Sequence, residues 1–146
     1  MRIREGFERH FRTSRVTDPW EPIYSRCDED AVRIGLTIGE AHCNARGFLH
    51  GGVIAALSDN AMGLSFVQAV RRNGGEAAAH ISAVTVSLSV DYLSSAQLGQ
   101  WLEVSPRVVH PGRSLGFVDA LVTADGAPIA RANAAFKVVG GGRAES

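Results

Sequence analysis

One acidic residue, Asp59, lies inside the most apolar stretch of the chain. It is the only charged residue among residues 51–70. Because burying an unpaired carboxylate costs several kcal/mol, we expect Asp59 to face inward and to be either paired or used in chemistry. A carboxylate in such a place can take a proton from water as a general base, or attack an electrophile itself.

The tripeptide His50-Gly51-Gly52 lies where this apolar stretch begins. The first N–H groups of a helix have no partner within the helix, and the helix dipole adds to their positive potential. Glycine also allows a ligand to approach the backbone closely. A helix that starts at these glycines could polarise a carbonyl oxygen while Asp59 activates water. Donors and base together would form a hydrolytic site.

The apolar stretch predicts a helix from Gly51 to about Arg71, which ends in basic residues and glycines. Because it has no polar face, we expect it to be buried nearly all round. Alternating apolar residues predict one strand before the helix and four after it, at residues 31–38, 81–93, 101–109, 115–123 and 129–139. This order predicts an α+β fold, in which a curved antiparallel sheet wraps around one central helix.

The remaining segments lie at the two ends of the chain. Residues 1–30 are polar and rich in arginine, and they predict a short helix followed by a loop. Residues 31–140 form the predicted domain, and residues 141–146 a flexible tail. We therefore expect one domain with an N-terminal extension.

Composition excludes several classes of partner. The 146 residues include 15 Lys and Arg against 15 Asp and Glu, which gives no bulk attraction to nucleic acid or to an anionic membrane. Polar residues within the helix favour burial in protein over a membrane span. Cys27 and Cys43 lack a CxxC spacing and predict free thiols, so we expect a cytoplasmic protein. No cofactor motif is present, and the spacing of His42, Cys43 and His50 fits no standard zinc site.

The order of elements, together with Asn44, His50-Gly51-Gly52 and Asp59 at their spacing, resembles the hotdog-fold acyl-CoA thioesterases of the phenylacetate-pathway (PaaI) and human thioesterase-superfamily-member type. The resemblance covers roughly residues 30–140. It implies hydrolysis of an acyl-CoA to a free carboxylic acid and coenzyme A, without a cofactor. It also implies a homodimer or a dimer of dimers, with sites at the subunit interface.

The resemblance assigns roles to four residues around the helix start and the acid. Asp59 would be the general base or nucleophile, and the Gly51 N–H would polarise the thioester carbonyl. His50 and Asn44 would shape the loop at that end of the pocket. The helix start of one subunit would face the carboxylate of its partner, so a monomer would be inactive.

Further residues would hold the water or the substrate. The hydroxyl of Thr85 would help to hold the attacking water, with Ser87 as the alternative. Arg113, on a predicted hairpin loop, could bind phosphates of coenzyme A. The expected lining of the substrate pocket is Gly52, Phe48, Leu49, Met62 and Phe66.

Two other functions stay open on the same fold. The first is a non-catalytic sensor that binds acyl-CoA. The second is an enoyl-CoA hydratase, which is less well supported because no aspartate has a histidine five residues later, as the pattern of such enzymes requires. The acyl group could be aromatic, medium-chain or short and branched, because any core would use the same apolar residue types.

Overall fold

The computed structural model describes residues 2–140, so the tail predicted at residues 141–146 lies outside the described residues. Within this range the chain forms one α-helix and seven strands, with short 3-10 turns at Asp18–Trp20, Glu40–His42 and Gly75–Ala78. These elements are β1 (Glu8–Arg9), β2 (Tyr24–Cys27), β3 (Val32–Thr37), α1 (Gly51–Gly74), β4 (Ser82–Tyr92), β5 (Trp101–His110), β6 (Leu115–Ala124) and β7 (Ala127–Val139).

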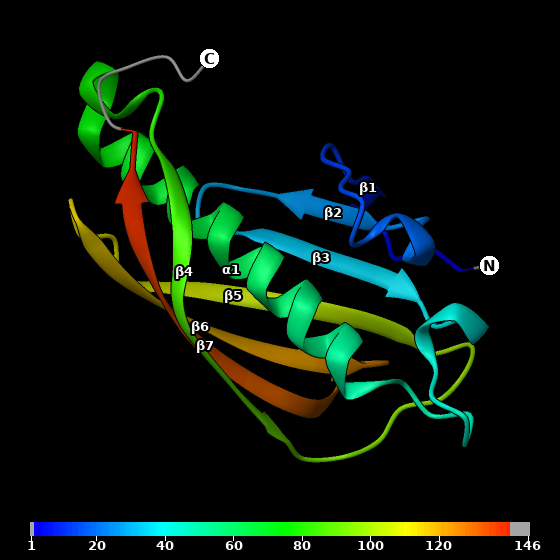
Figure 1. The fold of residues 1–146 in the computed structure, drawn as a ribbon. Helices are drawn as coiled ribbons and strands as arrows, with labels where there is room; N and C mark the ends of the chain where they lie inside the picture. The colour runs from blue at the N-terminus through cyan, green and yellow to red at the C-terminus, as the bar shows by residue number, and fades with distance from the viewer. Residues whose placement is uncertain (1, 141–146) are drawn as a thin grey trace.

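The strands form a single antiparallel sheet in the order β1-β2-β3-β5-β6-β7-β4. The sheet curves around α1, which lies across one of its faces (Figure 1). The predicted α+β hotdog fold is therefore confirmed. After α1 the chain enters the sheet at one edge, so β4 pairs with the last strand, β7, and has no strand on its other side within residues 2–140.

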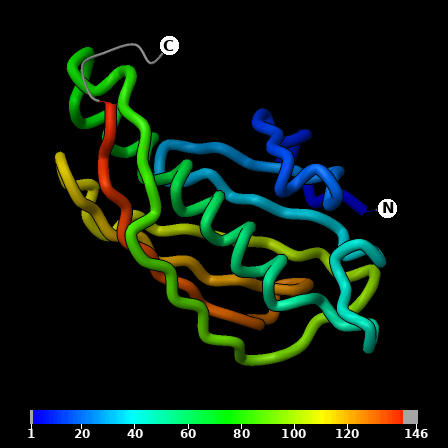
Figure 2. The backbone as a smooth tube through the Cα atoms, in the orientation of Figure 1, coloured from blue at the N-terminus to red at the C-terminus, as the bar shows by residue number. Residues whose placement is uncertain are grey.

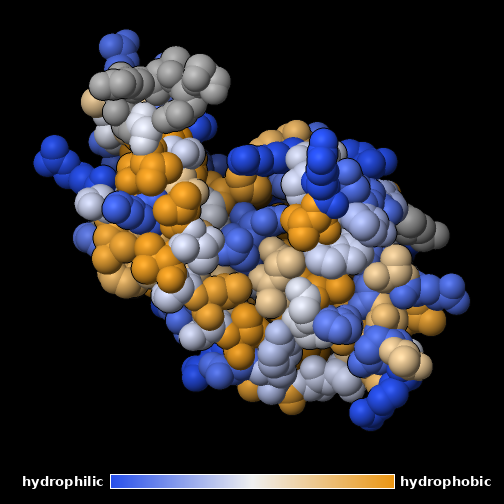
Figure 3. Space-filling model, viewed as in Figure 1, coloured by the Kyte–Doolittle hydropathy of each residue, from blue (hydrophilic) through white to orange (hydrophobic). Residues whose placement is uncertain are grey.

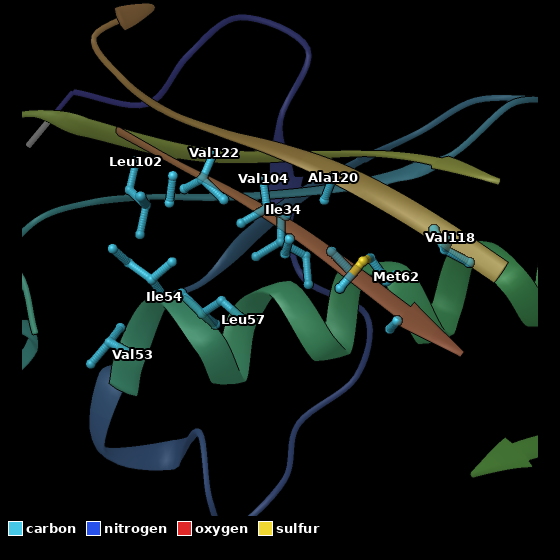
Figure 4. Close-up of a cluster of buried hydrophobic side chains, with 14 of the residues drawn as sticks. Ile34, Val53, Ile54, Leu57, Met62, Leu102, Val104, Val118, Ala120 and Val122 are labelled. Carbon is cyan, nitrogen blue, oxygen red and sulfur yellow. The ribbon is translucent and has the colours of Figure 1, made fainter. Parts of the chain in front are cut away.

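The core lies between α1 and the sheet. Ile54, Leu57 and Met62 of α1 point toward Val104 of β5 and Val122 of β6 (Figure 4). Each of these five side chains has an exposed fraction of 3% or less. Burying one such side chain fully contributes about 1.5–3 kcal/mol, so this layer holds α1 on the sheet and fixes the positions of both helix ends.

The opposite face of α1 is only half covered. Asp59, Gly63, Leu64 and Val67 are partly exposed. The expectation of a helix buried nearly all round is therefore wrong for the single chain. The sheet covers only one face of α1. The helix runs between β4 and the N-terminal segment (Figure 2), and a groove borders its other face there.

The helical segment Gly51–Ala78 is long and apolar enough, by length and composition alone, to cross a membrane. In the structure, 50% of the most apolar 18-residue part of this segment is buried in the protein. Its apolar residues pack against the sheet. This agrees with the prediction from the polar residues of the stretch, which favoured burial in protein over a membrane span.

The N-terminal residues differ from the prediction. Residues 2–20 form no α-helix, and β1 and β2 join the sheet instead, so the boundary expected at residue 30 does not separate an extension from the domain. The ring of Phe7 packs edge-on against Trp101, with ring centres 5.1 Å apart. Strands of two and four residues are too short to show an alternating pattern, which is why the sequence did not reveal them.

Candidate functional site

Asp59 and Thr85 contact each other across the space between α1 and β4. The hydroxyl Oγ1 of Thr85 donates a 2.7 Å hydrogen bond to Oδ1 of Asp59. Among residues 2–140 no cation pairs with Asp59 and no group donates to its Oδ2. The carboxylate is therefore held by one hydrogen bond, and its second oxygen is available to water or to a substrate.

A β-bulge in β4 decides which hydroxyl meets Asp59. Thr85 pairs with Phe136 of β7 and Leu88 pairs with Ala134, and the register shifts between Thr85 and Ser87. Phe136 and Ala134 are two residues apart and both buried, so they share the inner face of the sheet. Thr85 and Leu88 therefore also share this face, although they are three residues apart. The extra residue turns Thr85 inward, where it bonds to Asp59.

The helix start is built around His50, which is the N-cap residue of α1. Its backbone is extended (φ −73°, ψ 131°), and its Nδ1 accepts a 2.8 Å hydrogen bond from the N–H of Gly52. A Cβ atom at position 52 would lie 2.9 Å from this Nδ1, so the second glycine is needed for the cap. The N–H of Gly51 has no acceptor within residues 2–140 and is available to a ligand oxygen.

Tyr92 fixes the position of Gly51, a contact that sequence reasoning missed. Its hydroxyl donates a 2.6 Å hydrogen bond to the carbonyl oxygen of Gly51. A Cβ atom on Gly51 would lie 3.1 Å from the Tyr92 ring. Tyr92 is the last residue of β4, and its inward alternation with Leu88 and Val90 is the signal that could have pointed to this role.

Asn44 lies in the loop before α1 and closes that loop. Its Oδ1 accepts hydrogen bonds from the N–H groups of Arg46 (2.9 Å) and Phe48 (3.2 Å). This is the side-chain-to-backbone pattern of a turn residue. The loop also pairs with the segment after β4, through a bridge between Phe48 and Gln97. Asn44 thereby shapes the wall beside the helix start.

The candidate residues of one chain lie in two separate hollows. The first, here called the helix-start hollow, is bordered by Asn44, Arg46, Phe48, Leu49, Gly51, Ile54 and residues 92–96. The second, here called the Asp59 groove, runs along α1 from Asp59 to Arg71, with β4 and residues 10–17 beside it. Gly51 and Asp59 are eight residues apart on one helix, or about 12 Å along its axis. One carbonyl group cannot contact both residues of the same chain.

Two of the predicted substrate-binding residues have different surroundings from those expected. Met62 has an exposed fraction of 0% and packs in the core, so its place in the pocket lining is corrected: it points from α1 toward the sheet, away from the Asp59 groove. Phe66 is also fully buried, stacked on Phe136. Arg113 is exposed in the β5–β6 hairpin loop. This loop lies at the end of the molecule where α1 ends, opposite the start of α1 (Figure 1).

The N-terminal segment contributes two basic side chains to the lining of the Asp59 groove, those of His10 and Arg12. Burial lowers the pKa of His10 below its ordinary value, Glu21 acts against this, and Arg12 adds to it. Its Nδ1 is buried without a hydrogen-bond partner among the described residues. The imidazole therefore favours its uncharged form, and it adds no fixed positive charge to the groove at neutral pH.

Comparison with protein families identifies the fold and the enzyme class. The family model described as "Thioesterase superfamily" matches residues 46–129. The chain belongs to the thioesterase superfamily. It is a thioester hydrolase, and the resemblance drawn from Asn44, His50-Gly51-Gly52 and Asp59 is confirmed at the level of the family.

Two relatives share substantial sequence with this thioesterase. PA0474 of Pseudomonas aeruginosa, whose name describes it provisionally as an esterase, is 34% identical over 139 residues, which are 93% of this chain and 97% of the relative. Acyl-coenzyme A thioesterase 13 of Homo sapiens is 33% identical over 88 residues, which are 60% of this chain and 57% of the human protein. The match to the human enzyme thus spans little more than half of each chain.

Two solved structures share its fold. The protein smu.793 of Streptococcus mutans, bound to acetyl-CoA, is 27% identical with a TM-score of 0.69, and the match covers 98% of this chain and 96% of that one. The PaaI protein of the phenylacetic acid degradation operon of E. coli has a TM-score of 0.69 at 20% identity, over 82% and 81% of the two chains. The likeness to PaaI concerns the fold alone.

Proposed function

We propose that this protein is an acyl-CoA thioesterase that works as a homodimer or a dimer of dimers, with Asp59 as its general base or nucleophile. The observation that carries the proposal is the state of Asp59: a partly buried carboxylate that pairs with no described cation, is held by Thr85, and has one oxygen available in the groove beside α1. A relative named as an acyl-CoA thioesterase and a similar structure with bound acetyl-CoA support the choice of substrate.

The reaction needs a polarised carbonyl and an activated water. In the general-base route, Asp59 takes a proton from water and the resulting hydroxide attacks the thioester carbonyl carbon. The negative charge that develops on the oxygen is stabilised by the Gly51 N–H at the helix start, a contribution worth about 10²- to 10³-fold in rate. The C–S bond then breaks, and the thiolate of coenzyme A takes the proton back from Asp59.

The same geometry permits a nucleophilic route, in which Asp59 attacks the carbonyl carbon and forms a mixed anhydride. A single turnover in water labelled with oxygen-18 detects the nucleophilic route if water attacks the anhydride at the Asp59 carboxyl group. Direct attack of water on the thioester places the label in the released acid. Hydrolysis of the anhydride at the Asp59 carboxyl group leaves the label in the enzyme, where mass spectrometry of the Asp59 peptide detects it.

The shared site follows from distance. Because Gly51 and Asp59 of one chain are about 12 Å apart along α1, a carbonyl that contacts both must lie between two subunits. The free edge of β4 supports pairing of subunits, since an unpaired edge of this length attracts another strand. Val84 and Val86 of β4 have exposed fractions of 49% and 59% in the single chain and would be covered in an assembly.

The experiment is a free-thiol release assay on a panel of acyl-CoA thioesters, with Asp59→Asn as the test variant. Wild-type protein should release thiol, and Asp59→Asn should fold normally but lose activity by about 10²-fold or more. A variant with near-normal rate would overturn the role of Asp59. Tight binding of acyl-CoA by the wild type without thiol release would favour a non-catalytic sensor instead.

A further inference from the structure

We infer that residues 10–17, here called the N-terminal strap, form one wall of the acyl-binding groove, and that Phe11 and Val16 in this strap select apolar acyl groups. The inference rests on the proposed function and adds to it the side of the site on which the acyl chain lies. It also gives a function to a segment that the sequence predicted as an extension outside the domain.

The strap borders the same groove as the reactive pair. The Asp59 groove has Asp59, Gly63 and Val67 of α1 on its floor, Thr85 and Ala83 of β4 on one side, and the strap on the other. Figure 3 shows the surface hollowed between the N-terminal segment and β4. A substrate that reaches Asp59 through this groove must therefore pass alongside the strap.

The backbone of the strap is fixed at both ends. At its start the N–H of His10 donates to the carbonyl of Ile23, at 2.9 Å. At its end Thr17 is buried, its hydroxyl lies 2.9 Å from that of Ser14, and the carbonyl of Ser14 accepts from the N–H of Asp18 at 2.9 Å. The bond at the start ties the strap to the segment that leads into β2, and the bonds at the end close a local turn in which Thr17 is buried.

The side chains between these anchors remain uncovered. Phe11 and Val16 have exposed fractions of 64% and 65%, although each could have been replaced by a polar residue at no cost to the core. Two large apolar side chains that are held open at the rim of a reactive groove provide a contact surface for an apolar ligand. The ring of His10 lies against that of Phe11, with ring centres 4.6 Å apart.

The groove beyond the carboxylate is suited to an acyl chain. Gly63 lies one helical turn after Asp59, and its lack of a side chain lets the Phe136 ring approach the helix, since a Cβ atom there would lie 3.3 Å from that ring. Leu64 and Val67 add apolar surface along the same groove. Arg71 borders its far end, but its guanidinium already donates to the carbonyl of Ile81 at 2.8 Å.

The helix-start hollow has a mixed lining. Asn44, Arg46, Ser94 and Ser95 contribute polar groups near the Gly51 N–H, and Phe48, Leu49, Ile54 and Leu93 contribute apolar side chains. A thioester carbonyl joins an apolar acyl group to a polar coenzyme. With the carbonyl between Gly51 of one subunit and Asp59 of its partner, the acyl group lies along the strap, where Phe11, Val16, Leu64 and Val67 offer apolar contacts, and the coenzyme lies on the side of the helix-start hollow.

The test compares chain-length selectivity in full-length variants. The double variant Phe11→Ala with Val16→Ala is assayed for thiol release from acetyl-CoA, hexanoyl-CoA, dodecanoyl-CoA and phenylacetyl-CoA. The matched control is Ile3→Ala, which removes an exposed apolar side chain (45%) that borders a different hollow, near Trp101. We expect the ratio of kcat/KM for dodecanoyl-CoA to that for acetyl-CoA to fall about tenfold or more in the double variant, and to stay unchanged in Ile3→Ala.

Three results would overturn the inference. An unchanged ratio, or an equal loss for all four substrates, would show that the strap does not contact the acyl chain. A shift of the double variant to a smaller species in size-exclusion chromatography would show that the strap is a subunit contact. A wild-type protein that cleaves none of the thioesters would overturn the proposed function and the inference with it. In the first two cases the wild type is active, so the inference fails while the proposed function stands.

Discussion

The hydroxyl of Thr85 and the carboxylate of Asp59, 2.7 Å apart, join the edge strand β4 to the middle of α1. The bulge between Thr85 and Ser87 makes this contact possible, because it places Thr85 on the inner face of the sheet. The hydrogen bond fixes one carboxylate oxygen and leaves the other in the groove, so Thr85 sets the orientation of the Asp59 carboxylate.

Removing this hydroxyl should slow the reaction without unfolding the protein. In Thr85→Val the shape of the side chain is nearly kept while the hydrogen bond to the carboxylate is lost. We expect kcat to fall about 10- to 100-fold, since a hydrogen bond to a charged group is worth about 1.5–3 kcal/mol. Thr85→Ser keeps the hydroxyl and should retain most of the rate. Equal rates for Thr85→Val and the wild type would contradict the role of Thr85.

The Gly51 N–H can be deleted almost alone. Proline is well tolerated at the first position of a helix, and the extended backbone of His50 (ψ 131°) suits a residue before proline. Gly51→Pro should lower kcat by about 10²- to 10³-fold. Gly51→Ala, which also adds a Cβ atom 3.1 Å from the Tyr92 ring but keeps the N–H, measures the steric cost separately. If both variants lose the same activity, the N–H is not the donor.

Loss of the His50 N-cap of α1 should lower the free energy of unfolding. His50→Ala removes the acceptor of the Gly52 N–H and should lower the free energy of unfolding by about 0.5–2 kcal/mol. His50→Asn replaces one capping side chain with another and should restore most of this loss. Urea unfolding followed by circular dichroism measures both values, and an unchanged midpoint for His50→Ala would argue against the cap.

Met62 should affect stability and not selectivity. Because its side chain is fully buried between α1 and the sheet, Met62→Ala should lower the free energy of unfolding by about 2–5 kcal/mol. Met62→Leu nearly conserves the volume and should cost less than about 1.5 kcal/mol. The relative rates on different acyl-CoA thioesters should be the same in Met62→Leu as in the wild type. A changed order of preferred substrates would indicate that Met62 does line the substrate pocket.

Long periodic segments carried most of the predictive information about the fold. The apolar stretch from Gly51 predicted α1, and alternation predicted the strands from β3 onward, because each of these elements buries one face over several turns or residues. β1 and β2 contain two and four residues, which is too little for a pattern. Their place in the sheet depends on contacts such as that of Phe7 with Trp101, which lie far apart in the sequence.

The sequence predicted those residues of the candidate site whose type and surroundings alone suggest a chemical role. Asp59 and the glycines after His50 stand out because a lone acid and a glycine-rich helix start are unusual in an apolar stretch. The inward turn of Thr85 was carried over from a resemblance, since the bulge that causes it leaves no mark on the alternation of β4. Tyr92 was missed because only the tertiary fold brings its hydroxyl to the carbonyl of Gly51.

If Gly51 of one subunit and Asp59 of another form each site, a mixed-subunit experiment should restore activity. Asp59→Asn and Gly51→Pro proteins, each inactive alone, are unfolded, mixed in equal amounts, refolded and assayed for thiol release. A mixed dimer contains one site with both residues intact, so random pairing should restore about a quarter of the wild-type activity. No recovery from mixed dimers that have been isolated and shown to be folded would contradict the shared site.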